Sequence, residues 1–201
     1  MNSAAEFVLT AATGYCLGSV PFGLLIARVF TGIDPRSGGS GNVGATNVAR
    51  LCGFRWGLAT LACDLLKGCL PVLFTASSGD YDAAYLIGAC VVLGHMFSCF
   101  LRFRGGKGVA STVGVFLALA PGVLILAGAA CILTIWKSGF VSAGSLVLVG
   151  LLPVLLLFSG PPGSAPFALC LAAAVVWAHR DNIRRLRRGD EKSWLARRER
   201  P

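Results

Sequence analysis

Long apolar runs alternate with short polar stretches along the chain, and the runs have the length of membrane-spanning helices. A helix needs roughly 20 predominantly apolar residues to cross the hydrocarbon core of a bilayer. We expect full spans at residues 4–30, 54–75, 83–101, 140–158 and 162–178. The pattern therefore predicts an all-α polytopic membrane protein in which residues 1–201 form a single integral membrane domain.

Composition and charge agree with this prediction. Hydrophobic residues make up 55% of the chain and charged residues 13%, and 18 Lys and Arg outnumber 9 Asp and Glu. Half of the basic residues lie in residues 180–201, and most others lie in residues 28–55 and 102–107. Because basic residues collect on the cytoplasmic side of membrane proteins, we place these regions inside and the N-terminus outside. The positive charge thus reports topology, and we expect no nucleic-acid partner.

The apolar stretch of residues 109–136 carries Pro121 and Gly122 near its middle. Both residue types break helices. With the N-terminus outside and the C-terminus cytoplasmic, this stretch must begin and end on the cytoplasmic side. We therefore predict a re-entrant hairpin of two short helices, which gives seven helical segments in all. One uninterrupted tilted span is the alternative, and it would leave the basic C-terminal region outside.

The eight cysteines lie mostly inside apolar runs and form no C-x-x-C pair. Disulfide frameworks and structural zinc sites are therefore poorly supported. We expect the cysteines to act as small packing residues. We also expect no metal ion and no cofactor.

Two glycine-rich polar stretches have the composition of phosphate-binding loops. Residues 37–50 place hydroxyl and amide side chains between glycines, whose backbone can approach a ligand closely. Residues 102–111 contain three glycines around Lys107, just before a helix that we expect to begin at Val109. The glycine N–H groups could form an anion nest there. The nucleotide P-loop pattern fails, because Val109 stands where Ser or Thr is required.

Ionisable residues also occur inside the apolar runs. Asp64 and Lys67 lie three residues apart, a spacing that brings opposite charges together on one helical face. Such residues at membrane depth are costly and are usually functional or paired. A functional site and a structural ion pair both remain open here, as do packing and functional roles for His95.

A third polar region begins where the last apolar run ends. His179 and Asn182 share one face of a helix and could point into a common site. Histidine can exchange a proton near neutral pH. The neighbouring arginines have an ordinary explanation as anchors to anionic membrane lipids.

Taken together, these stretches resemble the bacterial acyl-phosphate-dependent glycerol-3-phosphate acyltransferases. The matching segments follow the family's order over essentially the whole chain. Small departures, such as Asp181 in place of Glu, lie beside the motif residues. The matching segments are residues 18–23, 39–50, 64–68, 94–95, 103–110, 141–142 and 179–186.

The resemblance implies transfer of a fatty acyl group from acyl phosphate to the 1-hydroxyl of sn-glycerol 3-phosphate. The products would be lysophosphatidic acid and phosphate, in the first acylation of bacterial phospholipid biosynthesis. It also implies a multi-pass protein of the bacterial inner membrane with its active site facing the cytoplasm. Its partners would be membrane lipids, the two substrates and, functionally, a separate enzyme that forms acyl phosphate.

The resemblance also implies roles for particular residues. The residues expected to be catalytic are Ser40, Arg50, Lys107, Ser142, His179 and Asn182. Those expected to bind substrate are Gly105, Gly106 and Gly108, with Asn42, Thr46 and Asn47 as second choices.

The acceptor hydroxyl must lose a proton as it attacks the acyl carbon. Acyl phosphate is already activated, so a covalent acyl-enzyme is unnecessary and no cysteine is placed as a nucleophile. The chain lacks the H-x-x-x-x-D pair of other glycerolipid acyltransferases, because Phe100 and Arg184 stand five residues after His95 and His179. The base is then His179 or a phosphate oxygen of the substrate. The resemblance favours the substrate phosphate, with the protein positioning the reactants.

A transporter or channel for a phosphorylated solute is the alternative from another class. It could use the Asp64–Lys67 pair and the broken helices. It predicts polar residues throughout the bilayer depth, whereas the candidate phosphate-binding residues cluster on one side of the membrane.

Overall fold

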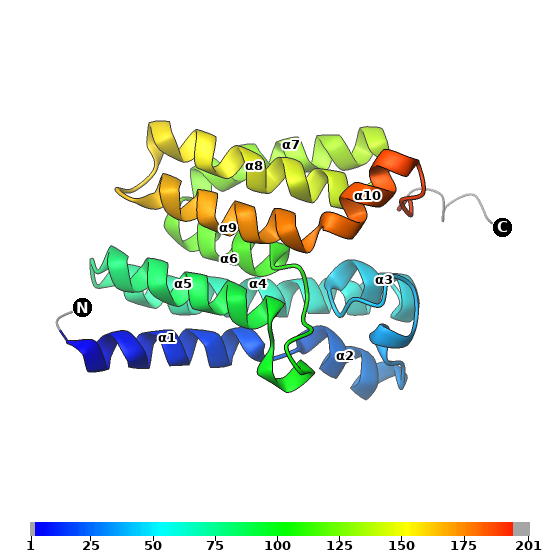
Figure 1. Cartoon of the computed structure of the whole chain (residues 1–201), viewed down its shortest axis with the longest axis horizontal. Helices are drawn as coiled ribbons and strands as arrows, with labels where there is room; N and C mark the ends of the chain where they lie inside the picture. Colours follow the sequence, from blue (N-terminus) through cyan, green and yellow to red (C-terminus); the bar gives the residue numbers. More distant parts are fainter. Residues whose placement is uncertain (1–2, 195–201) are drawn as a thin grey trace. The chain divides into compact units, whose positions relative to one another are not determined.

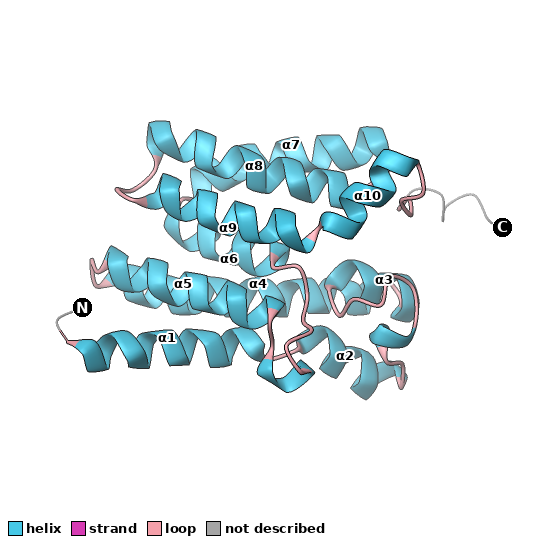
Figure 2. Ribbon diagram, viewed as in Figure 1, coloured by secondary structure: helices cyan, strands magenta, loops and turns pink. Residues whose placement is uncertain are grey.

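The computed structural model describes residues 3–194, and all regular secondary structure in this part of the chain is helical (Figure 1, Figure 2). The all-α prediction is therefore confirmed for these residues. The chain divides into two compact units, residues 1–119 and 120–201, and each is described by itself.

The first unit consists of helices joined by two polar loops. α1 packs along α5, and α4 packs against α3, α5 and α6 (Figure 1). The short 3-10 turns η1 and η2 lie in the two loops. The elements are α1 Ala4–Ser19, α2 Phe22–Thr31, η1 Pro35–Ser37, α3 Ala45–Cys52, α4 Phe54–Ser77, α5 Tyr81–Met96, η2 Cys99–Leu101 and α6 Val109–Leu119.

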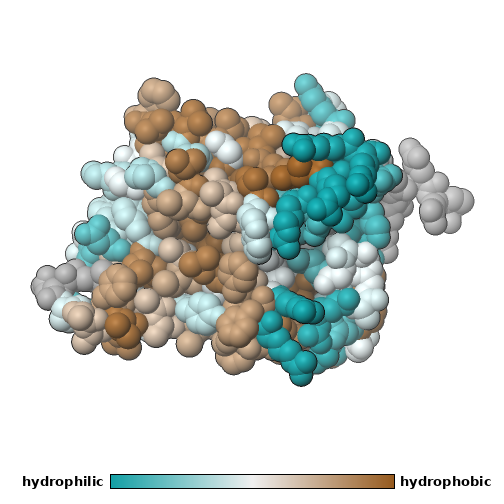
Figure 3. All heavy atoms as spheres, viewed as in Figure 1, coloured by the Kyte–Doolittle hydropathy of each residue, from teal (hydrophilic) through white to brown (hydrophobic). Residues whose placement is uncertain are grey.

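In the second unit, three apolar helices are followed by a short basic one. α8 packs against α7 and α9, and α10 contacts both α8 and α9. Figure 3 shows the contrast between the hydrophilic surface over α10 and the hydrophobic surface over the apolar helices. The elements are α7 Pro121–Ser138, α8 Val141–Ser159, α9 Ser164–Ala178 and α10 Arg180–Arg188.

Five segments of the described chain are long and apolar enough to cross a membrane. They are residues 4–31, 54–77, 81–101, 121–138 and 141–159, and two shorter apolar helices cover residues 109–119 and 164–178. The expectation of a polytopic membrane protein is therefore supported by helix length and composition. The first expected span, at residues 4–30, is divided into α1 and α2. Pro21 lies at the break. It interrupts the helix because proline lacks an N–H group and its ring clashes with the preceding turn.

The break expected near Pro121 is also present, since α6 ends at Leu119 and α7 begins at Pro121. α6 is short, with 11 residues, as predicted. α7 differs from the prediction, because its 18 residues are enough to cross a membrane. The two helices belong to different units, and the re-entrant hairpin stays a prediction.

Glycines hold the helices of the first unit close together. A Cβ atom added to Gly68 of α4 would lie 2.3 Å from the Ser111 carbonyl oxygen of α6. A Cβ added to Gly114 of α6 would lie 2.0 Å from the Leu65 carbonyl oxygen of α4. Small residues of this kind let membrane helices approach backbone to backbone. This contact fixes α6, and α6 in turn fixes the end of the glycine-rich loop that precedes it.

The polar loops of the first unit lie at one end of its helices. Residues 32–44 lead from α2 to α3, and residues 97–108 lead from α5 to α6 (Figure 1). Leu24 of α2, Val43 of the first loop and Leu101 of the second form a buried apolar cluster. The cluster holds the two loops close to each other.

We expect Gly68→Ala and Gly114→Ala each to destabilise the protein by about 1–3 kcal/mol, the usual cost of overpacking. The new methyl group would meet a carbonyl oxygen of the facing helix, so α4 and α6 must separate. Thermal unfolding of the purified protein in detergent measures the change. Gly128→Ala is the control, because no atom lies within 4 Å of its added Cβ. An equal loss of stability in this control would contradict the prediction.

Candidate active site

The first polar loop is organised by the amide side chain of Asn47. Its Nδ2 donates to the carbonyl oxygens of Pro35, Gly38 and Asn42 at 2.7, 3.2 and 2.9 Å, and its Oδ1 accepts the Ser40 N–H at 2.9 Å. The residue is only 2% exposed. Asn47, expected as a second-choice substrate contact, therefore shapes the loop from inside.

Other residues of the first loop take distinct places. Asn42 Oδ1 accepts the Gly44 N–H at 2.8 Å and so forms a turn before α3. Thr46 and Arg50 are half-buried on α3, and Ser40 is exposed. Among the candidates of this loop, Ser40 is thus the most exposed and Asn47 the most buried.

An ion-pair cluster fixes the chain at the start of the first loop. Asp34 Oδ2 lies 2.7 Å from both Arg28 Nη2 and Arg36 Nη2. The hydrogen bonds from Arg36, together with the one from Arg28, hold the pKa of the Asp34 carboxyl well below its usual range. Asp34 also caps the short η1 turn, since its Oδ1 accepts the Arg36 N–H at 3.0 Å. The cluster therefore stays charged at neutral pH and anchors the loop.

The second polar loop is held by the end of α5. The N–H of Gly105 donates to the Met96 carbonyl and the N–H of Gly106 to the His95 carbonyl, both at 3.0 Å. Two of the three glycines that were expected to form an anion nest thus donate their N–H groups to carbonyl oxygens of the chain itself. Gly108 has a φ of 83° and leads into α6, which begins at Val109 as expected. Lys107 lies half-buried between these glycines.

In the second unit, Ser142 and Asn182 meet at one carboxylate. Glu191 Oε1 accepts hydrogen bonds from Ser142 Oγ at 2.7 Å and Asn182 Nδ2 at 2.5 Å, while Arg185 Nε donates to Oε2 at 2.7 Å. Burial alone would raise the pKa of the Glu191 carboxyl, but the hydrogen bonds from these donors outweigh it and lower that pKa. Glu191 was not among the expected site residues, and its signal in the sequence is an acidic residue within a strongly basic segment.

His179 lies at the junction of α9 and α10 and is 2% exposed. Its Nδ1 lies 2.8 Å from the Val175 carbonyl oxygen. Because a carbonyl oxygen only accepts, Nδ1 carries the hydrogen in the neutral ring and Nε2 carries the lone pair. The contact therefore fixes the orientation of the ring and, in its neutral form, the tautomer.

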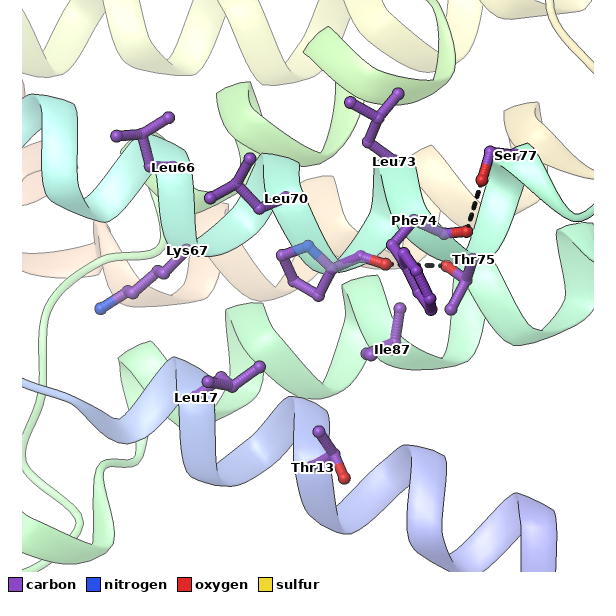
Figure 4. Close-up of a pocket in the computed structure, with 11 residues that line it drawn as sticks. Thr13, Leu17, Leu66, Lys67, Leu70, Leu73, Phe74, Thr75, Ser77 and Ile87 are labelled. Atoms are coloured by element: carbon purple, nitrogen blue, oxygen red, sulfur yellow. Dashed lines mark hydrogen bonds between the residues drawn. The ribbon is translucent and has the colours of Figure 1, made fainter.

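An apolar groove of about 750 Å³ lies along α4, beside α1 and α5. Figure 4 shows Leu17, Leu70, Leu73, Phe74 and Ile87 among the side chains that line it. Its volume falls within the roughly 300–1,000 Å³ typical of ligand pockets. The groove can therefore accept a hydrocarbon chain.

Residues 8–189 match the family described as glycerol-3-phosphate acyltransferase. The chain belongs to this family. Among its relatives is a glycerol-3-phosphate acyltransferase of Desulfovibrio desulfuricans, 57% identical over 94% of this chain and 85% of that protein.

Two crystal structures of PlsY, described as an integral membrane glycerol 3-phosphate acyltransferase, share the fold. The glycerol 3-phosphate form has a TM-score of 0.89 at 35% identity and covers 93% of this chain and 94% of the other. The lysophosphatidic acid form has a TM-score of 0.86 at 34% identity, with the same coverage. This acyltransferase is thus an integral membrane enzyme, and the resemblance drawn from its motifs is confirmed over the transporter alternative.

The structure groups the six expected catalytic residues in two sets. Ser40, Arg50 and Lys107 belong to the polar loops and α3 of the first unit, and Ser142, His179 and Asn182 belong to α8–α10 of the second. Of these, Ser142 and Asn182 are joined directly, through Glu191. Among residues 3–194, no group of three or more His, Cys, Asp or Glu side chains could hold a metal ion.

We expect Glu191→Gln to destabilise the acyltransferase by about 1.5–3 kcal/mol at neutral pH, the usual worth of hydrogen bonds to a charged group. A carboxyl whose pKa is lowered on folding contributes stability above its ordinary pKa of 4.5, and this contribution is lost as the pH falls through the folded value. The difference in melting temperature between wild type and variant should therefore shrink in acid.

Asp190→Asn is the matched control, because Asp190 is the exposed neighbour of Glu191. It should leave the melting temperature near that of the wild type. A Glu191→Gln protein as stable as the wild type at neutral pH would show that the carboxylate is not needed to hold α8 and α10 together.

Proposed function

We propose that this enzyme transfers a fatty acyl group from acyl phosphate to the 1-hydroxyl of sn-glycerol 3-phosphate. The acceptor oxygen forms a bond to the acyl carbon, the bond from that carbon to the phosphate oxygen breaks, and phosphate leaves with the electron pair. The products are lysophosphatidic acid and phosphate. The observation that carries the proposal is the similarity to PlsY, whose crystal structures are described as glycerol 3-phosphate and lysophosphatidic acid forms.

The polar loops of the first unit suit two phosphorylated substrates. Arg50 and Lys107 supply positive charge, and Ser40 supplies a hydroxyl donor at the exposed surface of the first loop. Hydrogen bonds between cationic groups and phosphate are short and strong. The same donors can stabilise the negative charge that develops on the acyl carbonyl oxygen during attack. We assign Gly105, Gly106 and Gly108 to the backbone that presents Lys107.

His179 and Asn182 supply orientation in the second unit. The fixed tautomer of His179 presents Nε2 as an acceptor for the proton of the attacking hydroxyl or for a hydrogen bond from it. The phosphate of the acceptor substrate can take the proton instead, and we favour this route. The protein then accelerates the reaction by holding the reactants in place, which can contribute a large part of the barrier reduction.

The membrane supplies the setting for the lipid substrate. The apolar groove beside α4 offers a surface to the acyl chain. We place the enzyme in the bacterial inner membrane, as one domain with its N-terminus outside, its C-terminus inside and its active site facing the cytoplasm, since its basic residues gather in the loops and the C-terminal region. It would perform the first acylation of phospholipid biosynthesis and receive acyl phosphate from a separate enzyme.

We expect the purified protein to form lysophosphatidic acid from palmitoyl phosphate and labelled glycerol 3-phosphate, without divalent metal or acyl-CoA. Lys107→Ala should lower kcat/KM by about 100-fold or more, because loss of a charged transition-state contact costs roughly 3 kcal/mol. Thin-layer separation of the labelled lipid measures the product. Lys137→Ala, which removes an exposed cation at the end of α7, is the control and should keep full activity.

Three results would contradict this proposal. Product formed from acyl-CoA but not from acyl phosphate would show that the donor is wrong. Turnover lost with a chelator and restored by a metal ion would show that a metal is needed. Full activity in Lys107→Ala would remove the glycine-rich loop from the reaction.

A second measurement identifies the base. We expect His179→Gln to lower turnover by less than about 100-fold, the lower end of the effect of a general base. The pH dependence of kcat/KM should keep its shape, because the substrate phosphate takes the proton. A loss of about 1,000-fold or more with a flattened pH profile would identify His179 as the base.

A further inference from the structure

Three ionisable side chains form a buried network in the first unit. Lys67 Nζ lies 2.7 Å from Asp64 Oδ1, and His95 Nδ1 lies 3.5 Å from the same oxygen. Asp64, Lys67 and His95 are only 2%, 8% and 7% exposed. Charges at membrane depth are costly, and the network lies outside the set of residues assigned to the reaction. Its role therefore has to be sought in what it touches.

One arm of the network reaches the break between α1 and α2. Lys67 Nζ donates to the Val20 carbonyl oxygen at 3.0 Å and lies 5.6 Å from the centre of the Phe22 ring. In Figure 4 the Lys67 side chain extends away from Leu70 and Phe74 of its own helix. The ammonium group thus holds the chain on both sides of Pro21.

This break leads directly into the first polar loop. A Cβ atom added to Gly23, at the start of α2, would lie 1.9 Å from the Val43 carbonyl oxygen. The beginning of α2 and the first loop are therefore in backbone contact. A shift of the chain at Val20 would displace Val43 and, with it, the turn that carries Ser40 and α3.

The other arm of the network supports the second polar loop. The His95 carbonyl accepts the Gly106 N–H at 3.0 Å, and a Cβ added to Gly106 would lie 2.0 Å from His95 Nε2. The imidazole ring therefore lies directly against Gly106. The orientation of this ring therefore determines where the backbone of Gly106 lies, and with it the position of the neighbouring Lys107.

Both arms end around one small interior cavity. Its lining includes Val20, Phe22 and Val43 on one side and Asp64, Lys67 and His95 on the other. The contacts from the first loop to the second loop thus pass through a continuous set of buried and half-buried groups, with Asp64 at the centre.

We propose that Asp64, with Lys67 and His95, is a positioning residue that sets the two polar loops relative to each other, so that they bind the phosphates of both substrates. The inference rests on the proposed function, which assigns phosphate binding to these loops. A buried ion pair contributes little to stability compared with well-packed apolar residues, but removing one partner leaves an uncompensated charge. The network is thus better explained by the geometry it imposes than by the stability it adds.

The double variant Asp64→Asn with Lys67→Met separates these two roles. It removes both charges together, so the melting temperature should stay close to that of the wild type. Because Met cannot donate to the Val20 carbonyl, the loops lose their common support. We expect the KM for glycerol 3-phosphate to rise about tenfold or more, equivalent to about 1.4 kcal/mol, with a smaller change in kcat.

Val72→Ala is the matched control. Val72 is fully buried on the same helix, and its truncation leaves a cavity that costs stability without touching either loop. It should lower the melting temperature and leave KM unchanged. An equal rise of KM in this control would overturn the proposal, because general loosening of the fold would then explain the effect. A double variant with wild-type KM for both substrates would also overturn it.

His95→Leu keeps the Asp64–Lys67 pair and therefore tests the second arm alone, even where the double variant does not fold. It should weaken glycerol 3-phosphate binding while the melting temperature changes little. Calorimetric titration with glycerol 3-phosphate measures this binding without a donor substrate, so the inference can fail while the acyl-phosphate reaction stands, and the reverse. Unchanged binding in His95→Leu would overturn the proposal.

Discussion

The bilayer interior offers no water to hydrogen-bond a broken backbone, and most features of this protein follow from that constraint. Long helices satisfy their own N–H and C=O groups, so difficulties arise only where a helix stops. In the first unit, α1 stops at Ser19 and α5 stops at Met96. Polar side chains satisfy the backbone at both places: the buried Ser98 Oγ donates to the Ser19 carbonyl at 2.6 Å, and the half-buried Tyr15 Oη donates to the Phe97 carbonyl at 2.6 Å.

Hydrogen bonds of this kind also hold the two polar loops in place. A polar side chain buried to satisfy a broken helix has a fixed position, because moving it would leave a carbonyl or a charge without a partner. In the first loop the buried Asn47 side chain donates to three carbonyl oxygens, and in the second loop the backbone carbonyl of His95 accepts the Gly106 N–H. The loops assigned to phosphate binding are therefore held before any substrate arrives. Preorganised donors of this kind stabilise charge without reorganising during the reaction.

The sequence predicted the features that depend on neighbouring residues. The break at Pro121 and the start of α6 at Val109 follow from local chemistry, and both are present. The interruption of the span at residues 4–30 by Pro21 follows from the same chemistry, and it divides the span into α1 and α2. The motif segments indicated the family because the order of motifs along the chain can be read from the sequence alone, without knowing which residues are in contact.

Features that depend on distant partners could not be predicted in this way. Glu191 and Ser142 are 49 residues apart in sequence, and only the folded chain shows that they are hydrogen-bonded. The N–H groups of Gly105 and Gly106 were expected to bind an anion, and they instead donate to carbonyl oxygens at the end of α5. Asn47 was expected as a ligand contact because its amide lies in a glycine-rich loop. Its side chain is instead buried and hydrogen-bonded to backbone groups of that loop.

Each of the two units uses one carboxylate to hold neighbouring helices together. In each, one buried carboxylate gathers donors from different elements: Asp64 joins α4 and α5, and Glu191 joins α8 and α10. A carboxylate suits this task because it offers about four acceptor positions and keeps its charge near cationic partners. Ser142 and Asn182 both donate to Glu191, and these contacts hold α10, whose N-cap residue is His179. Lys67 and Arg185 are each paired with one of these carboxylates at 2.7 Å and thereby hold parts of the fold together.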